Sequence, residues 1–337
     1  MKKSITKILL ASMACTLAMS LAACGTKTDA PKAASSQAPA SGKVTVYMPS
    51  PAGLSNKIAK GFEKKTGIKV EQFQGTTGEI LARLEAEKSN PVADVVILAS
   101  WSDGLSMKQK GELTAYQPKE ADKLVKDFKD NDNTLFGYSA SAVGVIYNKN
   151  VFPTLDADWS ELANPEYQGK LAIPDPEKSG ACKDFLAGYV SKYGWDALEG
   201  MAKNGMKVPG ANKAALEAVT TGEVGILVAG VDYNAYSSIK KGEPLAIYYP
   251  KSGTIVNPRP AMIMKSAPDK ENAQKFMDYL LSDEVQQMVA DANLLPGRQD
   301  VKAKNIQLSD IPQIPADWTK MMSIASETAA KLNALCK

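Results

Sequence analysis

The sequence predicts an α/β fold, and two features of the chain indicate it. From residue 43 onward, short runs rich in Val, Ile and Leu alternate with segments that repeat apolar residues every three to four positions. Such alternation is typical of sheets that helices cover on both faces. The composition, with 44% hydrophobic and 23% charged residues, is that of a globular protein, and a mature chain of about 300 residues suffices for one large core or two smaller ones.

The elements follow in order along the chain. Segment 43–50 is expected to be a strand. Leu54, Ile58 and Phe62 then recur at helical spacing, and Gly67 ends that helix because glycine readily adopts the left-handed conformation found after helices. The further expected elements are a strand at 68–74, a loop and helix at 75–88, strands at 93–100, 141–149, 170–175, 224–230 and 245–250, and the longest amphipathic helical pattern at 269–292.

The first residues predict a secretory signal. Lys2, Lys3 and Lys7 precede an apolar run at 8–22 that is short for a membrane span and ends in small residues. The ending Leu-Ala-Ala-Cys resembles the lipobox of bacterial lipoproteins, which implies a signal peptide at 1–23 and a lipid on Cys24. Residues 24–42 have no large apolar side chain and are expected to form a lipidated flexible tether. The resemblance places the protein in the cell envelope, outside the cytoplasm and anchored to the membrane through Cys24.

Charge and rare residues exclude several classes of function. Without residues 1–23, the chain has equal numbers of basic and acidic residues, so no basic surface for nucleic acid is expected. Histidine is absent, which excludes Ser-His-Asp and Cys-His catalysis and zinc sites with histidine ligands. Cys182 and Cys336 remain beyond the signal and the lipobox, and we expect two free thiols, although the pair could oxidise in an extracytoplasmic compartment.

Several segments, taken in order, resemble one family of receptors. They are VTVYMPS, FEKKTGIKV, GTTGEILARLEAEKSNPVADVVI, GKLAIPDPEKSGA, YYPKSGTIVNPRPAMIM and ENAQKFMDYLLSDEVQQMVADANLLPGRQDV. The set is similar to the extracellular solute-binding proteins of ABC importers, in the branch with ferric-ion, thiamine, phosphosugar and aminoethylphosphonate receptors. The resemblance implies a non-catalytic, monomeric receptor without a cofactor, whose partners are a small solute and an ABC permease in the membrane.

The resemblance also implies a two-lobed, type II periplasmic-binding-protein-like fold. Two extended segments are expected to cross between the lobes, one near Ser141 to Tyr147 and one near Tyr248 to Ile255. The lobes are expected to close on the solute. Residues 43–142 with 256–337 are expected to form the first lobe and residues 143–255 the second.

Two loops are candidates for binding an anionic solute. Each follows a strand and opens a helix, where free N–H groups and the positive end of the helix dipole attract anions. The first loop supplies Thr76, Thr77 and Gly78, and the second supplies Ser179, Gly180 and Ala181. Ordinary helix capping explains either loop alone, whereas the two together favour anion capture.

Other residues at strand ends are weaker candidates. Ser50, Ser100 and Ser139 lie at strand ends or near the first crossing. Asp232 and Tyr233 follow strand 224–230, where a carboxylate could receive a ligand ammonium group and a phenol could donate a hydrogen bond. Alternatively, Asp232 only caps the helix that begins there.

Two other functions stay open. Asp232, Tyr233 and Tyr236 could bind a ferric ion or a ferric complex, although the adjacent Tyr248 and Tyr249 should point to opposite faces of a strand. A secreted enzyme with Ser179 or Cys182 as nucleophile is the remote alternative, because no histidine base and no Gly-x-Ser-x-Gly motif is present. The sequence favours a receptor for an anionic solute, with an organic phosphate or phosphonate as the expected ligand and no metal.

Overall fold

The computed structural model describes residues 42–49 and 51–337. The expected signal peptide, Cys24, most of the tether and Ser50 lie outside this part of the chain. Within the described part, no helix is long and apolar enough to cross a membrane.

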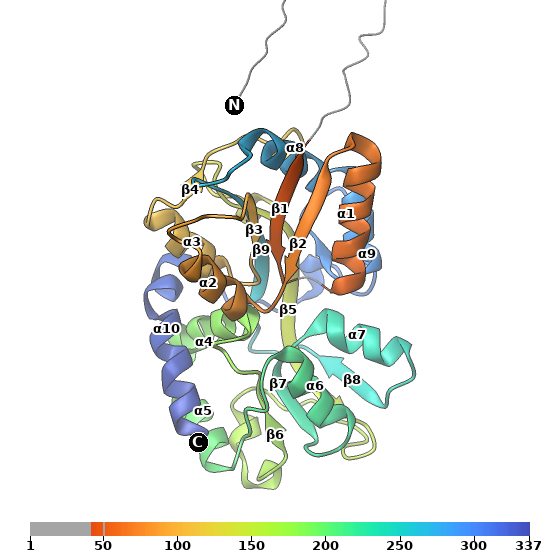
Figure 1. Cartoon of the computed structure of the whole chain (residues 1–337). Coiled ribbons are helices and arrows are strands. Elements are labelled where there is room, and N and C mark those ends of the chain that lie inside the picture. Colours follow the sequence, from red (N-terminus) through yellow and green to blue (C-terminus); the bar gives the residue numbers. More distant parts are fainter. Residues whose placement is uncertain (1–41, 50) are drawn as a thin grey trace, which may run out of the picture. The chain divides into compact units, whose positions relative to one another are not determined.

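The strands form one mixed, ten-stranded sheet in the order β2-β1-β3-β9-β5-β7-β6, with β4 on β9 and with β8 and β10 on β5. The alternation of strands and helices along the chain therefore yields the α/β fold that the sequence predicts (Figure 1). The strands are β1 Lys43–Met48, β2 Lys69–Gln74, β3 Val95–Ile97, β4 Leu113–Thr114, β5 Phe136–Asn148, β6 Leu171–Ala172, β7 Ile226–Val231, β8 Leu245–Tyr248, β9 Val256–Met264 and β10 Leu295–Pro296.

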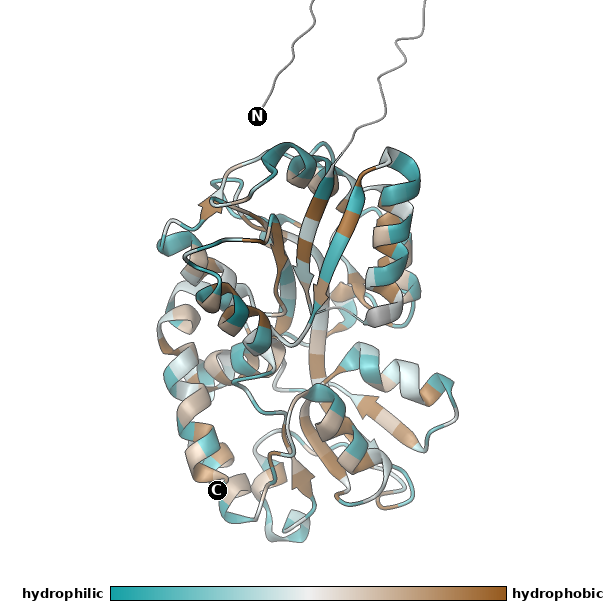
Figure 2. Cartoon of the chain, viewed as in Figure 1, coloured by the Kyte–Doolittle hydropathy of each residue, from teal (hydrophilic) through white to brown (hydrophobic). Residues whose placement is uncertain are grey.

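Helices cover the sheet, and their polar faces point outward while apolar residues gather along the strands (Figure 2). The α-helices are α1 Ala52–Thr66, α2 Thr77–Ala86, α3 Trp101–Gln109, α4 Gly180–Tyr193, α5 Asp196–Lys203, α6 Asn212–Thr220, α7 Asp232–Lys240, α8 Lys270–Leu280, α9 Asp283–Asp291 and α10 Trp318–Leu335. Short 3₁₀ helices occur at Ala121–Lys123, Lys126–Phe128, Glu161–Ala163, Pro165–Tyr167 and Leu308–Asp310.

Strand β5 joins the two parts of the sheet. Its first half, from Phe136 to Ala142, pairs antiparallel with β9. Its second half, from Val143 to Asn148, pairs with β7 on one side and β8 on the other. Thr254 lies just before β9, and its Oγ1 donates to the carbonyl oxygen of Val143 at 2.7 Å. This bond fixes the segment before β9 to β5, at the point where β5 changes from pairing with β9 to pairing with β7 and β8. The boundaries 142/143 and 255/256 remain a prediction.

Some expected elements differ in extent. The pattern at 269–292 forms two helices, because the chain leaves α8 at Leu281 and the Ser282 side chain caps α9. The strand expected at 93–100 is limited to Val95–Ile97, since Ser100 caps α3. The longest α-helix of the described chain is α10, which the sequence analysis did not single out, and it packs on α3, α4 and α5.

The core is apolar and continuous around the first strands. Phe62 of α1 meets Phe276 of α8 edge to face, with ring centroids 5.2 Å apart, and both side chains are fully buried. Contacts of this kind combine the burial of a large apolar area with a favourable ring geometry. They hold α1 and α8 over the sheet.

Candidate functional site

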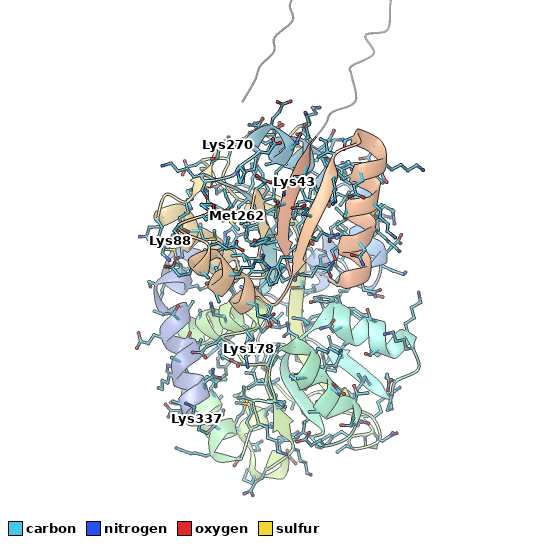
Figure 3. The ribbon with its side chains drawn as sticks, in the orientation of Figure 1. Lys43, Lys88, Lys178, Met262, Lys270 and Lys337 are labelled. Carbon is cyan, nitrogen blue, oxygen red and sulfur yellow. The ribbon has the colours of Figure 1, made fainter. Side chains whose placement is uncertain are left out.

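The two loops expected to bind an anion meet in the structure. A side chain at Gly78 would collide with the carbonyl oxygen of Glu177, and a Cβ at Gly180 would lie 2.7 Å from the carbonyl oxygen of Ala99. Lys178, labelled in Figure 3, lies at this junction, where α2 and α3 approach the start of α4. The loops are therefore side by side, as two halves of one clamp would be.

The hydroxyl groups of the first loop already have partners within the protein. Thr76 forms a capping box with Glu79, in which each side chain bonds the other residue's backbone N–H. The Oγ1 of Thr77, which is buried, accepts from the N–H of Ala99 at 3.1 Å. Both residues therefore serve the local fold.

The hydroxyl groups of Ser179, in the second loop, and of Ser100, after β3, are engaged in the same way. Ser179 caps α4 by accepting from the N–H of Cys182 at 3.2 Å, and it donates to Oδ1 of Asn212 at 2.8 Å. Ser100 caps α3 and donates to Asp184 at 2.9 Å. Capping explains the hydroxyls of Thr76, Ser179 and Ser100, and the bond from Ala99 explains that of Thr77. Contact of these hydroxyls with a solute remains a prediction.

A second group of polar residues lies on the paired strands β5 and β9. Ser139 lies opposite Arg259, and Ser141 lies opposite Asn257, so the four side chains share one face of the strand pair. We call Ser139, Ser141, Asn257 and Arg259 the crossing row. Ala140, Ala142 and Val256, which alternate with them, belong to an apolar cluster on the opposite face.

Each member of the crossing row is at most 1% exposed and has a polar atom without a partner. The unpartnered atoms are Oγ of Ser139, Oγ of Ser141, Oδ1 of Asn257 and Nε of Arg259. Buried polar groups in native proteins are nearly always hydrogen-bonded, because leaving one unpaired costs about 1–3 kcal/mol. Four such atoms on one face make the crossing row a candidate site for a polar solute.

Arg259 differs from the other two arginines of the chain. Arg83 pairs with Glu87 at 2.7 Å, and Arg298 pairs with Asp283 and Asp300, each at 2.6 Å. Among the ion pairs of the described residues none involves Arg259, whose Nη2 donates to the carbonyl oxygen of Pro49. Its guanidinium carbon lies 5.8 Å from the ring centroid of Tyr233. The crossing row thus contains a buried positive charge without a carboxylate partner.

The crossing row borders the start of α4. The side-chain amide of Asn257 donates to the carbonyl oxygen of Ala181 at 3.3 Å. Ala181 is the second residue of α4, so the positive end of this 14-residue helix lies beside the row. The predicted residues Ser139, Gly180 and Ala181 therefore gather in one place with Arg259 and Asn257.

Asp232, the first residue of α7, is buried and bonded on both oxygens. Its Oδ2 accepts from the N–H of Ala142 at 3.1 Å and from the phenol of Tyr249 at 3.2 Å. Its Oδ1 accepts from the N–H of Tyr233 at 2.8 Å. Complete burial raises the pKa of Asp232 to about 7, against the lowering effect of these hydrogen bonds. Asp232 therefore joins α7 to β5.

The tyrosines near Asp232 divide between two places. The phenols of Tyr236 and Tyr249 are 3.2 Å apart, so Tyr249 links Tyr236 to Asp232. Tyr248 instead donates to the carbonyl oxygen of Ala157 at 2.8 Å, consistent with the alternation along β8. Burial raises the pKa of Tyr233, and the nearby Arg259 guanidinium opposes that rise. Within the described residues, no three His, Cys, Asp or Glu side chains gather to hold a metal ion.

Cys182 does not have the surroundings of a nucleophile. It is fully buried, its thiol donates to the carbonyl oxygen of Pro174 at 3.2 Å, and burial raises its pKa well above the ordinary value. Reactive cysteines need an accessible thiolate with a lowered pKa. In the structure Cys182 and Cys336 are both free thiols.

A cavity of about 1010 Å³ lies on the other face of β9, lined in part by Trp101, Val256, Pro258 and Trp318. Lys108 at its edge is paired with Asp130 and Asp132 at 2.6 Å each. This cavity has no buried charge without a partner, so the crossing row is the better candidate for a charged solute.

The sequence alone did not single out Arg259, Asn257, Ser141 and Tyr249 as candidate site residues. One signal was available, because the chain has only three arginines and Arg259 stands between two prolines. The common face of Arg259, Asn257 and Ser141 depends on the pairing of β5 with β9, which residue spacing does not reveal.

The chain matches a known family over residues 90–323, described as bacterial extracellular solute-binding protein. It belongs to this family. Proteins of the family bind small solutes outside the cytoplasm and work with ABC permeases, and membership supports a non-enzymatic role.

Individual relatives differ in the solutes that their names state. The chain is 26% identical over 291 residues to iron uptake protein A1 of Synechocystis, covering 81% of this chain and 80% of the relative. It is 25% identical over 283 residues to a putative 2-aminoethylphosphonate-binding periplasmic protein of Salmonella typhimurium, covering 76% and 80%. The fold resembles that of the periplasmic binding protein AfuA of Actinobacillus pleuropneumoniae, solved with fructose-6-phosphate, with a TM-score of 0.78, 22% identity and coverage of 86% and 96%. The structural neighbours are type II periplasmic binding proteins, which confirms the predicted fold class.

Removing a hydroxyl from either loop separates a capping role from solute binding. We expect Thr77→Ala and Ser179→Ala each to lower the free energy of unfolding by about 1 kcal/mol, because each loses a bond to a backbone N–H. Urea unfolding of the solute-free proteins measures this, with the exposed Ser323→Ala of α10 as the control. Unchanged stability together with a tenfold or greater loss of solute affinity would instead assign these hydroxyls to the solute.

Asp232 gives the stability a definite dependence on pH. Its folded-state pKa of about 7 lies above the ordinary value of 3.8, so the native protein retains a proton that the unfolded chain releases. Its contribution is therefore fully present below about pH 4 and is lost as the pH rises toward and through 7. We expect urea midpoints between pH 5 and 8 to fall less steeply in Asp232→Asn than in the wild type. An equal slope in both would contradict this, and Asp317→Asn, at an exposed helix cap, is the control.

Proposed function

We propose that this protein is the receptor of an ABC importer and that it captures an anionic solute, an organic phosphate or phosphonate, for delivery to the permease. The observation that carries the proposal is the buried Arg259 without a carboxylate partner, which lies beside three further polar side chains with unpartnered atoms.

The cost of burying charge supports an anionic partner. An unpaired ion in the protein interior carries a penalty of several kcal/mol, which a bound anion would offset. Arginine is well suited to this because its planar group can donate two parallel hydrogen bonds to a phosphate or carboxylate. The serine hydroxyls and the start of α4 add neutral donors around the same point.

The solutes named for relatives agree with this chemistry. A 2-aminoethylphosphonate-binding relative and a structure with fructose-6-phosphate both concern molecules with a phosphonate or phosphate group. Asp232 could attract an ammonium group of a phosphonate, but three donors of the protein already bond its oxygens. The crossing row alone therefore carries the argument for the anionic part of the solute.

Iron is the second candidate, and one observation favours it. Asp232, Tyr249 and Tyr236 form a chain of oxygen atoms close to Tyr233, and one relative is named an iron uptake protein. The positive charge of Arg259 beside Tyr233 opposes a bare ferric ion there. A ferric complex with a bound anion would be compatible with both groups.

The same proposal includes the lobes and the membrane attachment. Residues 43–142 with 256–337 and residues 143–255 would be the two bodies that close on the solute, joined through β5 and β9. Helix α10 packs on α4 and α5 as well as on α3, so it would contact both bodies. Each receptor would act as a monomer held to the membrane by a lipid on Cys24.

Replacing Arg259 tests the proposed anion site. In Arg259→Met, we expect affinity for the bound solute to fall at least about 30-fold, because a charge-assisted contact in a buried site is lost. Stability without solute should stay equal or rise, since a buried unpaired charge is removed. Calorimetric titration with inorganic phosphate, 2-aminoethylphosphonate and fructose 6-phosphate, alongside urea unfolding, measures both quantities.

The control is Arg83→Met, which removes an arginine whose partner is Glu87 and should leave affinity unchanged. Lower stability of Arg259→Met with unchanged affinity would show that Arg259 is structural. A visible tyrosinate-to-iron band with a labile ferric chelate, absent in Tyr249→Phe, would favour the iron receptor.

Replacing Cys24 tests the attachment. In the full-length chain, Cys24→Ser should give a folded protein that leaves the membrane fraction, because the described fold begins beyond the tether. Detergent-free fractionation of cells measures the distribution, and Cys182→Ser is the control. A variant that stays with the membrane would argue against a lipid on Cys24.

A further inference from the structure

A buried carboxylate occupies the N-terminus of α3. Asp184 comes from α4, and its side chain is inaccessible to solvent. Its Oδ1 accepts from the Ser100 hydroxyl at 2.9 Å, and its Oδ2 accepts from the N–H of Trp101 at 2.8 Å and of Ser102 at 3.5 Å. These N–H groups lie in the first turn of α3, and they have no carbonyl partner within that helix. Asp184 therefore takes the place that an anionic solute would have there.

An ion pair lies next to this carboxylate. Nζ of Lys183, the residue before Asp184, is 3.0 Å from both carboxylate oxygens of Asp103 in the first turn of α3. The side chains of Lys183 and Asp103 are only 10% and 14% exposed, so the pair is shielded from water. Two consecutive residues of α4 thus hold the first turn of α3 through opposite charges.

The contact joins segments on opposite sides of the crossing. Helix α3 precedes β5, and α4 follows it. Their starts are so close that a Cβ on Gly180 would lie 2.7 Å from the Ala99 carbonyl oxygen, so glycine is needed there. The contact therefore lies between the two lobes proposed above.

We propose that Ser100, Trp101, Asp103, Lys183 and Asp184 form an interlobe clasp that holds the lobes together in the absence of solute. This goes beyond solute binding and rests on the proposed lobes, not on the identity of the solute. Because the clasp uses only protein groups, it favours the closed arrangement for every solute equally. Its loss lowers the closed population and with it the apparent affinity.

Asp130 provides a matched comparison. Its carboxylate is also largely buried and accepts from the N–H groups of Thr134 and Leu135 at 2.8 and 2.9 Å, and it pairs with Lys108. All these partners lie within residues 43–142. Loss of Asp130 should therefore lower stability without changing how the lobes are placed.

The experiment compares Asp184→Asn with Asp130→Asn in the solute-free protein. We expect a larger radius of gyration by small-angle X-ray scattering only in Asp184→Asn, and roughly tenfold faster amide hydrogen exchange in the first turns of both α3 and α4. Lys183→Met, which breaks the ion pair at the less buried edge, should show the same changes to a smaller extent and remains informative if Asp184→Asn does not fold.

A folded clasp variant with an unchanged radius of gyration and unchanged exchange in α4 would overturn the proposal, because the contact would then be static packing. Equal expansion in Asp130→Asn would do the same. Since scattering and exchange are measured without solute, a failure of the proposed anion site leaves this result intact.

Discussion

The antiparallel pairing of β5 with β9 is the constraint on which the rest of the structure depends. These two strands continue from the first strands of the sheet toward β7 and β8, so their register decides how both parts are placed. Side chains alternate between faces along each strand. One face of the pair therefore carries Ala140, Ala142 and Val256 in an apolar cluster, and the other carries the crossing row. A shift of one residue would bury apolar groups where the polar ones now lie.

The free N–H groups at the helix starts of this protein can be satisfied in two ways. A helix N-terminus needs acceptors for its free N–H groups, and either a side chain or a solute can provide them. Thr76 and Ser179 provide a side-chain acceptor for α2 and α4, and Ser100 with Asp184 provides acceptors for α3. The same residue types that suggest anion binding are therefore largely used in capping, which explains why the loop motifs alone were ambiguous.

Local patterns account for what the sequence could predict. The helical spacing of Leu54, Ile58 and Phe62 and the left-handed Gly67 define α1 and its end without reference to the rest of the chain. Candidate residues at loop-to-helix junctions were likewise found, because capping is local. Arg259 and Asn257 could not be assigned in this way, since they gain their neighbours Ser139 and Ser141 only through strand pairing between distant segments. The break between α8 and α9 was missed because the apolar stripe continues across Ser282.

The distribution of buried charge supports the proposal that the crossing row binds an anion. Asp184 and Asp232 are both buried at helix starts, and backbone N–H groups and hydroxyls of the protein bond their oxygens. Arg298 is surrounded by carboxylates. Each of these charges is compensated within the fold, so none requires a solute. Arg259 differs from these charges, because its Nε has no partner and its neighbours are the Pro49 carbonyl and the Tyr233 side chain, not a carboxylate. Because a buried cation is stabilised most by an opposite charge at short range, the remaining electrostatic demand of this interior is for an anion at the crossing row.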